Sequence, residues 1–386
     1  MSLEWVEIGE LQAKKNGSID PSKFLDETFE LHSIPSHDKG NAEILTGREI
    51  GSSKQIVQEN DVMISKIVPH IRRAMVVPKK GNFRQIASSE WIVFRSERIY
   101  PNYLKHLLIS DFFNAQFMAT VSGVGGSLLR ARPTFVSKIK IPLPPLTEQK
   151  RIAQILDKAD ELRQKRQQSI EKLDELLQAT FIDMFGDPIS NSNNLKVVEL
   201  SQLCQKVTDG THQSPKWENE GIPFLFISNI VNGEIDYSSN KYISQETYNQ
   251  LTKSTKIEIN DILYTTVGSY GNVARVKTDK LFCFQRHIGH IKPNQSKVNA
   301  VFLENMLSSF GVKMQADRLV KGVAQKTLNL KDLKSLLVFD IPIIEQENFV
   351  KISNKIKMQK QTLTAQLTEQ ENLFKSLQQR AFNGEL

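Results

Sequence analysis

The sequence predicts two copies of an α/β (α+β) domain, each followed by one long helix, with the two helices packed antiparallel as a coiled coil. Three observations lead to this prediction. The chain repeats its own motifs, two stretches of about forty residues have helical spacing, and the parts between them alternate strand-like runs with turns. A chain of 386 residues can hold two or three domains that each bury their own core.

The repeat is seen first in the motif IPLPPLTEQKRI at 141–152, which returns as IPIIEQENFVKI from residue 341. NDVMI at 60–64 likewise matches NDILY at 260–264, and Glu148-Gln149 matches Glu345-Gln346 after a short deletion. Chance does not keep such an offset over half a chain, and the period is far too long for a solenoid. We therefore expect a pseudo-two-fold molecule whose segments are 1–145, 146–187, 188–344 and 345–386.

The two shorter segments have the spacing of long helices. Apolar residues recur every three or four positions from Ile152 to Met184, and again from Phe349 to Leu377. Arg166 and Gln370 are polar positions on these stripes. A helix of about 38 residues is ~57 Å long and needs a partner for its apolar stripe. The two helices are natural partners for one another; the alternative is that each packs on its own globular domain.

The two longer segments mix strand and helix signals. Short β-branched and aromatic runs lie between turn-rich stretches such as SHDKGN and DGTHQSP. Helical periodicity is clearest at 103–118 and 302–319. The runs with strand character are 62–64, 91–94, 224–227, 262–266 and 281–284.

Charge points to a polyanionic partner for the longer segments. Residues 1–145 and 188–344 each carry a net charge of +4, whereas 146–187 carry −2 and 345–386 carry +1. No apolar run is long enough to cross a membrane, and the N-terminus lacks a signal pattern. The only cysteines, Cys204 and Cys283, lie 79 residues apart and form no CxxC pair. We expect a cytoplasmic protein without membrane contact.

Motifs of catalysis are missing from the sequence. There is no Gly-rich cofactor loop after a strand and no Asn/Asp-Pro-Pro-aromatic tetrapeptide, so we expect neither a cofactor nor an enzyme. The glycines at 123–126 lack the Gly-Lys-Ser/Thr of a phosphate-binding loop and are interpreted as a turn. His287 and His290 have no further ligands for a metal site, and we expect them to be strand residues near the face that binds the polyanionic partner, or in the core.

Taken together, the duplicated apolar-Pro pair, Glu-Gln motif and long helix resemble the specificity subunit of type I restriction–modification systems. TDGTH at 208–212, with Pro215, is similar to the family's Asp-Gly-x-His loop. GVAQK at 322–326 is similar to the segment before its Pro and Glu-Gln motif. The first copy departs from this pattern, because 14–24 lack Asp-Gly-x-His and 123–130 lack Gln-Lys. The two domains should therefore read different sequences.

The resemblance implies a non-catalytic role in a larger complex. Each longer segment would be a target recognition domain that reads one half of a bipartite DNA sequence. The helices would set the spacing and dock two methyltransferase subunits, which motor-nuclease subunits then join. On this resemblance we place a partner-binding surface at the Glu-Gln motifs, namely at Glu148, Gln149, Arg151, Glu345 and Gln346.

Contacts to double-stranded DNA are expected from basic and hydrogen-bonding residues in the two globular segments, since Arg reads guanine and Lys grips phosphate. The candidates are Lys66, Arg72, Arg73, Arg84, Arg130, Arg132, His212, Lys216, Tyr270, Arg286 and Lys326. Two other functions stay open at this point: a coiled-coil scaffold that binds proteins, and a DNA methyltransferase with unrecognised motifs. Binding of S-adenosylmethionine by the isolated chain would favour the methyltransferase.

Overall fold

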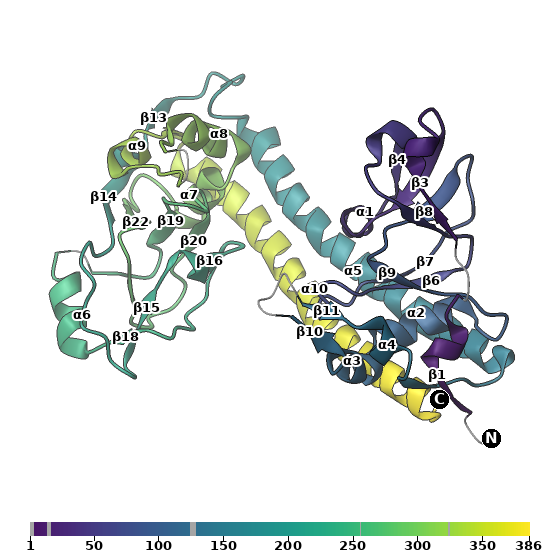
Figure 1. Ribbon diagram of the computed structural model, residues 1–386. Coiled ribbons are helices and arrows are strands. Elements are labelled where there is room, and N and C mark those ends of the chain that lie inside the picture. The colour runs from purple at the N-terminus through teal and green to yellow at the C-terminus, as the bar shows by residue number, and fades with distance from the viewer. Residues whose placement is uncertain (1–3, 14–16, 124–128, 255, 323–324) are drawn as a thin grey trace. The chain divides into compact units, whose positions relative to one another are not determined.

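The computed structural model describes residues 4–13, 17–123, 129–254, 256–322 and 325–386. Two long helices dominate it: α5 (Leu146–Phe185) and α10 (Ile343–Asn383) (Figure 1). The chain divides into two compact units. The first holds 1–168 with 364–386, and the second holds 169–363. Each unit contains an α/β domain together with parts of both long helices, which confirms the predicted fold class.

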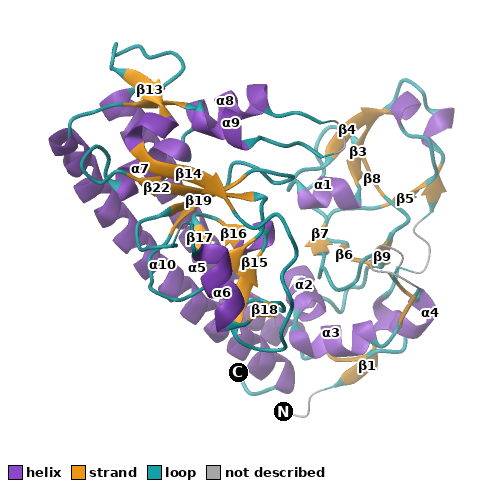
Figure 2. Cartoon of the chain, turned by 90° about the vertical axis from the view of Figure 1, so that its left-hand side faces the viewer, coloured by secondary structure: helices purple, strands orange, loops and turns teal. Residues whose placement is uncertain are grey.

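The first unit has two main sheets, which Figure 2 shows as separate groups of strands. One has the order β7-β6-β9 and the other β2-β5-β8-β3-β4, and two strand pairs, β1-β12 and β10-β11, complete the unit. The strands are β1 (Trp5–Glu7), β2 (Ser18–Ile19), β3 (Thr28–His32), β4 (Glu43–Thr46), β5 (Lys54–Ile56), β6 (Val62–Ser65), β7 (Ala74–Val76), β8 (Arg84–Ala87), β9 (Trp91–Phe94), β10 (Val121–Ser122), β11 (Arg130–Ala131) and β12 (Lys140–Pro142). The helices are α1 (Ile34–Asp38), α2 (Pro101–Ile109), α3 (Asp111–Met118) and α4 (Pro133–Val136).

The second unit has the same plan with shorter accessory strands. Its sheets have the orders β14-β22-β19-β20 and β18-β15-β21, beside the pairs β13-β23 and β16-β17. The strands are β13 (Val197–Glu199), β14 (Cys204–Asp209), β15 (Ile222–Leu225), β16 (Ile230–Val231), β17 (Glu234–Ile235), β18 (Tyr242–Ile243), β19 (Ile262–Thr265), β20 (Val273–Arg275), β21 (Cys283–Phe284), β22 (Ile288–Pro293) and β23 (Leu337–Phe339). The helices are α6 (Gln245–Thr252), α7 (Ala300–Leu307), α8 (Phe310–Leu319) and α9 (Leu330–Lys334).

Each helical stretch predicted within a domain is two helices and not one. The stretch at 103–118 breaks between α2 and α3, and the stretch at 302–319 breaks between α7 and α8. Serine causes both breaks, because the Ser110 hydroxyl accepts from the Phe113 N–H and the Ser309 hydroxyl accepts from the Val312 N–H. An extended serine that caps the next helix ends the previous one. The glycine turn predicted at 123–126 lies, from residue 124 on, outside the described residues.

The internal repeat is visible in single hydrogen bonds. Asn60 and Asn260 both have positive φ, 70° and 76°, in the turn that enters β6 and β19. The carboxylates of Asp61 and Asp261 each accept from the backbone N–H three residues earlier, at 3.0 and 2.8 Å. Asparagine tolerates this left-handed conformation better than most residues, and aspartate closes the turn. The repeated Asn-Asp pair is therefore a turn motif that starts the central strand of each domain.

The glutamine of the Glu-Gln motif fastens each long helix to its own domain. The Gln149 side chain accepts from the Tyr100 N–H at 2.7 Å and donates to the carbonyls of Arg98 and Pro144, both at 2.8 Å. Gln346 accepts from the Asn299 N–H at 2.7 Å and donates to the carbonyls of Lys297 and Ile341 at 3.0 and 2.6 Å. Both side chains are 1% exposed. We call these three hydrogen bonds of each glutamine the Glu-Gln lock. Its partners are all backbone groups, so it does not depend on the domain's side chains.

We expect Gln149→Ala to destabilise the first unit by about 2–4 kcal/mol, because it leaves buried backbone groups of Tyr100 and Pro144 without partners. Urea unfolding measures the loss, and hydrogen exchange locates it in α2. The matched control is Glu148→Ala, which removes an exposed ion pair with Arg151 and should cost under about 1 kcal/mol. Equal effects of the two substitutions would contradict the lock.

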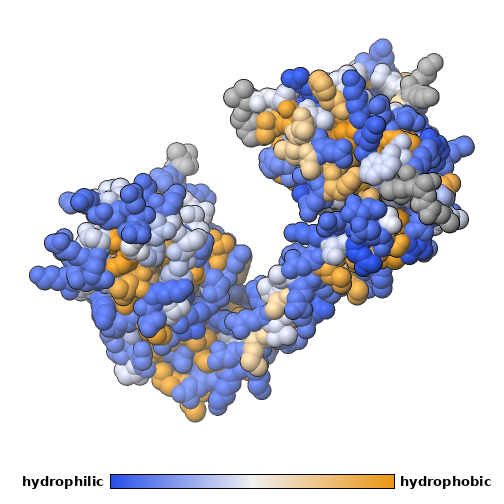
Figure 3. Space-filling model, turned by 90° about the horizontal axis from the view of Figure 1, so that it is seen from below, coloured by the Kyte–Doolittle hydropathy of each residue, from blue (hydrophilic) through white to orange (hydrophobic). Residues whose placement is uncertain are grey.

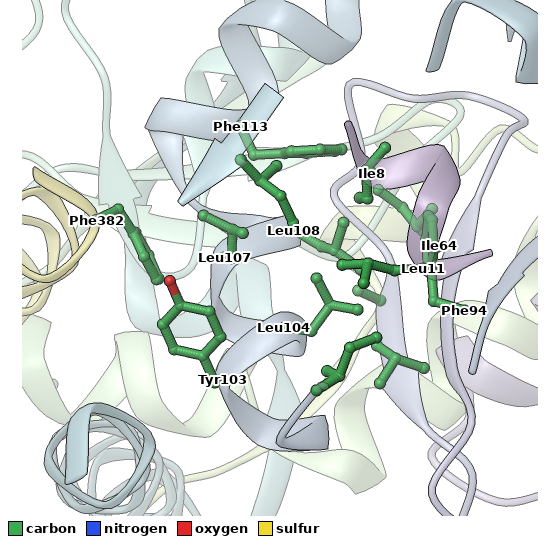
Figure 4. Close-up of a cluster of buried hydrophobic side chains, with 14 of the residues drawn as sticks. Ile8, Leu11, Ile64, Phe94, Tyr103, Leu104, Leu107, Leu108, Phe113 and Phe382 are labelled. Atoms are coloured by element: carbon green, nitrogen blue, oxygen red, sulfur yellow. The ribbon is translucent and has the colours of Figure 1, made fainter. Parts of the chain in front are cut away.

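In the first unit the start of α5 packs against the end of α10. Ile152 and Leu156 share one buried cluster with Phe374, Ala381 and Phe382. Figure 4 shows the Tyr103 ring of α2 facing Phe382, at 5.7 Å between ring centroids. In this unit α5 thus contacts both α10 and its own domain, and the end of α10 contacts the first domain as well. Both predicted alternatives for the partner of the α5 stripe are therefore found together.

In the second unit the end of α5 packs against the start of α10. The four rings of Phe181, Phe185, Phe302 and Phe349 contact one another, with centroids 5.2 to 6.0 Å apart. Because the two units pair opposite ends of the helices, α5 and α10 run antiparallel. An aromatic cluster of this kind is worth more than its buried area alone.

The polar stripe positions meet each other. Arg166 of α5 donates to Gln366 and Gln370 of α10, which explains why both stripes are interrupted there. Within the described part of the chain, no helix is both long and apolar enough to span a membrane.

Candidate nucleic-acid interface

The second unit has a small cavity beside the TDGTH loop. It has a volume of about 240 Å³ and is lined by three aromatic residues and by two segments that carry polar groups. The lining residues are Thr211, His212, Gln213, Ser214, Pro215, Trp217, Phe224, Phe226, Gln285, Arg286 and His287. The structure thereby brings together two predicted DNA-binding residues, His212 and Arg286, that are far apart in the sequence. Aromatic faces beside Arg and His donors suit the recognition of nucleic-acid bases.

Backbone hydrogen bonds hold the TDGTH loop against the turn that joins β21 to β22. The Thr211 N–H donates to the Phe284 carbonyl at 3.1 Å, and the Arg286 N–H donates to the Thr211 carbonyl at 3.0 Å. Position 210, just before Thr211, requires glycine, because a Cβ on Gly210 would lie 2.2 Å from the Phe284 carbonyl oxygen. The glycine of this motif therefore permits the close approach of two backbones.

We expect Gly210→Ala to push the loop away from the turn and to weaken binding to the target DNA by about tenfold or more, since contacts from both segments are displaced. The control is Gly51→Ala, where a Cβ meets no atom within 4 Å. Competition binding with the assembled complex measures the effect. Full affinity in a folded Gly210→Ala protein would show that the loop does not contact DNA.

Three of the predicted residues of the second unit, His212 among them, lie beside a carboxylate. His212 lies 3.0 Å from Asp209, and Lys216 is 85% exposed with Glu218 at 3.8 Å. The Tyr270 hydroxyl donates to Asp317 at 2.7 Å, and this bond raises the pKa of the tyrosine. Lys326 is exposed, and residues 323–324 of its predicted GVAQK motif lie outside the described residues.

In the first unit three of the predicted residues lie close together. Lys66 follows β6, and Arg130 begins β11, where Ile67 and Arg130 form a bridge. Glu90 is shared by both cations, at 3.2 Å from Arg130 and 3.9 Å from Lys66. Arg132 donates to the Ser122 hydroxyl at 2.8 Å. These three cations form the strongest candidate DNA surface of the unit.

The remaining arginines of the first unit are tied to acidic groups elsewhere. Arg73 makes two bonds of 2.7 Å to Asp38, which hold the pKa of that carboxyl below its usual range. Arg72 pairs with Asp111 at 2.5 Å, and Arg84 pairs with Glu27 at 3.1 Å. Arg73 is largely buried, with 11% of its side chain exposed, so it is less accessible than Lys66, Arg72 and Arg84.

The five predicted partner-binding residues fall into two groups, buried glutamines and more exposed charged residues. Gln149 and Gln346 face the interior, as described above, and offer a partner no side-chain surface. Glu148 and Arg151 form an ion pair at 2.6 Å on the outside of α5, and Glu345 is exposed on α10. A partner at this motif would contact these charged neighbours and not the glutamines. Figure 3 shows mainly hydrophilic residues on the face that it draws.

Sequence reasoning missed residues that support the candidate site. Glu90 is acidic and was not sought at a DNA surface, and Trp217 lies in a loop without a motif. His287 is in a turn, whereas His290 is buried in β22 and lies 2.7 Å from Asp261. Among the described residues, no cluster of three or more metal-ligating side chains is present.

The fold and the site define a class of protein: two α/β domains on packed long helices, each with a polar recognition surface. The family model described as type I restriction modification DNA specificity domain matches residues 3–172 and 192–370. The chain belongs to this family.

Relatives with curated names agree. The EcoBI specificity subunit of Escherichia coli is 30% identical over 277 residues, which cover 64% of this chain and 58% of that subunit. The chain thus matches less than two thirds of that relative's length. The MjaX specificity subunit of Methanocaldococcus jannaschii, named as putative in its description, is 26% identical over 335 residues, 81% of this chain and 74% of that subunit.

Solved structures share the fold. A chain from a structure of the type I restriction–modification system, concerned with complex assembly and conformational transition, has a TM-score of 0.61 at 20% identity. It covers 100% of this chain and 98% of its own length. The S subunit from M. genitalium has a TM-score of 0.55 at 14% identity, with 99% and 96% covered.

Proposed function

We propose that this chain is the non-catalytic DNA-specificity subunit of a type I restriction–modification complex. Its two domains read the two halves of a bipartite, asymmetric sequence in double-stranded DNA. Two methyltransferase subunits dock on α5 and α10, and motor-nuclease subunits join through them. We place this complex in the cytoplasm, where DNA is accessible and both cysteines stay reduced.

The observation that carries this proposal is a shared scaffold with unlike surfaces. The Asn-Asp turn and the Glu-Gln lock are the same in both units, whereas the polar residues of the candidate surfaces differ: Lys66, Arg130 and Arg132 in one, His212 and Arg286 in the other. Two readers of one kind with different contacts are what an asymmetric target needs. The proposed domain limits are 1–145 and 188–344, with 146–187 and 345–386 as spacers.

Reconstitution tests the proposal. The purified chain alone should neither methylate nor cleave DNA, whereas the chain with its methyltransferase partner should methylate adenines at one bipartite sequence. Omission of the chain should abolish this methylation. Methylation by the chain in a preparation free of partner subunits would refute the non-catalytic role.

A further inference from the structure

The two units place different residues at one equivalent position, and hydrogen bonds identify that position without reference to the sequence. In the first unit the Lys66 N–H donates to the Glu90 carbonyl at 3.0 Å, and in the second the Thr266 N–H donates to the His287 carbonyl at 2.9 Å. The turn before it is closed in the same way, by Trp91 to Ser88 at 3.2 Å and by Ile288 to Gln285 at 3.1 Å. Glu90 and His287 are therefore structural counterparts, although no motif marks them.

Each counterpart accepts a hydrogen bond from an arginine. The Glu90 carboxylate accepts from the Arg130 guanidinium at 3.2 Å. The His287 Nε2 accepts from the Arg286 Nε at 3.3 Å. An acceptor nitrogen carries no proton, so this contact requires neutral His287. Burial, followed by the charge of Arg286, lowers the pKa of His287, in agreement with that state.

The arginine comes from a different part of the scaffold in each unit. The Ala131 N–H donates to the Lys66 carbonyl, and the Leu328 N–H donates to the Thr266 carbonyl, both at 2.8 Å. The counterpart of Arg130 is thus Thr327. Arg286 directly precedes His287 in the turn, and Ser89 directly precedes Glu90. The counterpart of Arg286 is therefore Ser89. One unit presents its guanidinium from the strand next to the turn, and the other presents it from the turn itself.

Both arginines are available for a ligand. Arg130 is 58% exposed, and Arg286 is exposed at the rim of the aromatic cavity. The His287 contact uses the Arg286 Nε, and its terminal nitrogens bond to no described residue. The Glu90 contact instead uses the Arg130 Nη1 and leaves Nε and Nη2 of that guanidinium. In each arginine two nitrogens are left to form the fork that pairs with O6 and N7 of guanine. The turn is itself fixed, because the backbones of Arg286 and His287 bond to two separate segments.

Resting on the proposed function, we propose that Glu90 and His287 are equivalent positioning residues. Each orients one arginine to read a guanine, Arg130 in the first half-site and Arg286 in the second. The same scaffold position thereby supports both readers. Because the arginine comes from a different segment in each unit, the guanine that it contacts lies at a different place in each half-site.

The test uses the complex of the full chain with its methyltransferase subunit and the duplex that this complex selects. Guanines of the second half-site are replaced one at a time by 7-deazaguanine, which lacks N7. At one position the replacement should weaken binding about tenfold, and it should have no effect on the Arg286→Ala complex. His287→Ala should lose most of that discrimination, whereas His287→Gln, which keeps an acceptor, should retain it. Arg130→Ala, Glu90→Ala and Glu90→Gln give the same comparison for the first half-site.

Lys216→Ala is the control, because an exposed lysine on phosphate should weaken all sequences alike. The inference is overturned if no guanine lies in the half-site, or if 7-deazaguanine weakens the normal and arginine-free complexes equally. It is also overturned if His287→Ala weakens all duplexes uniformly, as a purely structural role would. A wild-type complex that selects no sequence at all would instead refute the proposed function.

Discussion

A chimera that carries residues 1–145 of a relative with another target will recognise a hybrid sequence, with a new first half and the original second half. The replaced segment lies entirely in the first unit, and its two ends meet where β1 pairs with β12. The Gln149 lock bonds only to backbone atoms, so it survives a change of side chains. Each mismatched base pair costs about 1–3 kcal/mol, so affinity for the original target should fall on the order of 100-fold or more.

Mapping of methylated adenines in cells that express the chimera and its methyltransferase measures this outcome. The reciprocal chimera, with 188–344 exchanged, is the control and should change the second half alone. If either folded chimera altered both halves of the target, the two domains would not be independent readers.

Lengthening the helices will lengthen the gap between the half-sites. One heptad is added after Gln168 and one after Gln366. Arg166 bonds to Gln366 and Gln370, so the two insertions lie at about the same level of the antiparallel pair. Seven residues add ~10 Å, or about three base pairs at ~3.4 Å each, and turn the stripe by ~20°. The preferred gap should grow by one to three base pairs, with weaker binding because the groove turns once per ~10.5 base pairs.

Selection from duplexes of randomised gap length measures the preferred gap. A heptad in one helix alone is the control. It shifts that helix along the other, so residues that pack against each other no longer meet, and folding should be impaired. An unchanged gap in a folded double-insertion complex would mean that something other than the helices sets the spacing.

Local patterns predicted the elements that local physics controls. The stripes from Ile152 and from Phe349 predicted both long helices to within a few residues, and the β-branched runs at 62–64 and 262–266 predicted β6 and β19. The breaks at Ser110 and Ser309 were not predicted, because a serine does not interrupt an amphipathic pattern. Only the structure shows that its hydroxyl caps the next helix.

The candidate site was harder to predict, because its residues come together only in the folded chain. Residue type alone nominated Arg73, which is largely buried against Asp38, on the same terms as Arg286, which is exposed. The family resemblance placed Gln149 on a partner surface, whereas in the structure its amide bonds to the backbone of its own unit. Glu90 could not be predicted from residue type, since an acidic residue at a DNA surface is informative only when an arginine is bound to it.

The proposed function requires two separate DNA readers in one chain. Its most direct test is selection of bound duplexes from a fully random library by the wild-type chain with its methyltransferase subunit. We expect two short, different sequence blocks separated by a gap of constant length and no preferred sequence. A single continuous block, a palindrome, or no enrichment at low salt would contradict it.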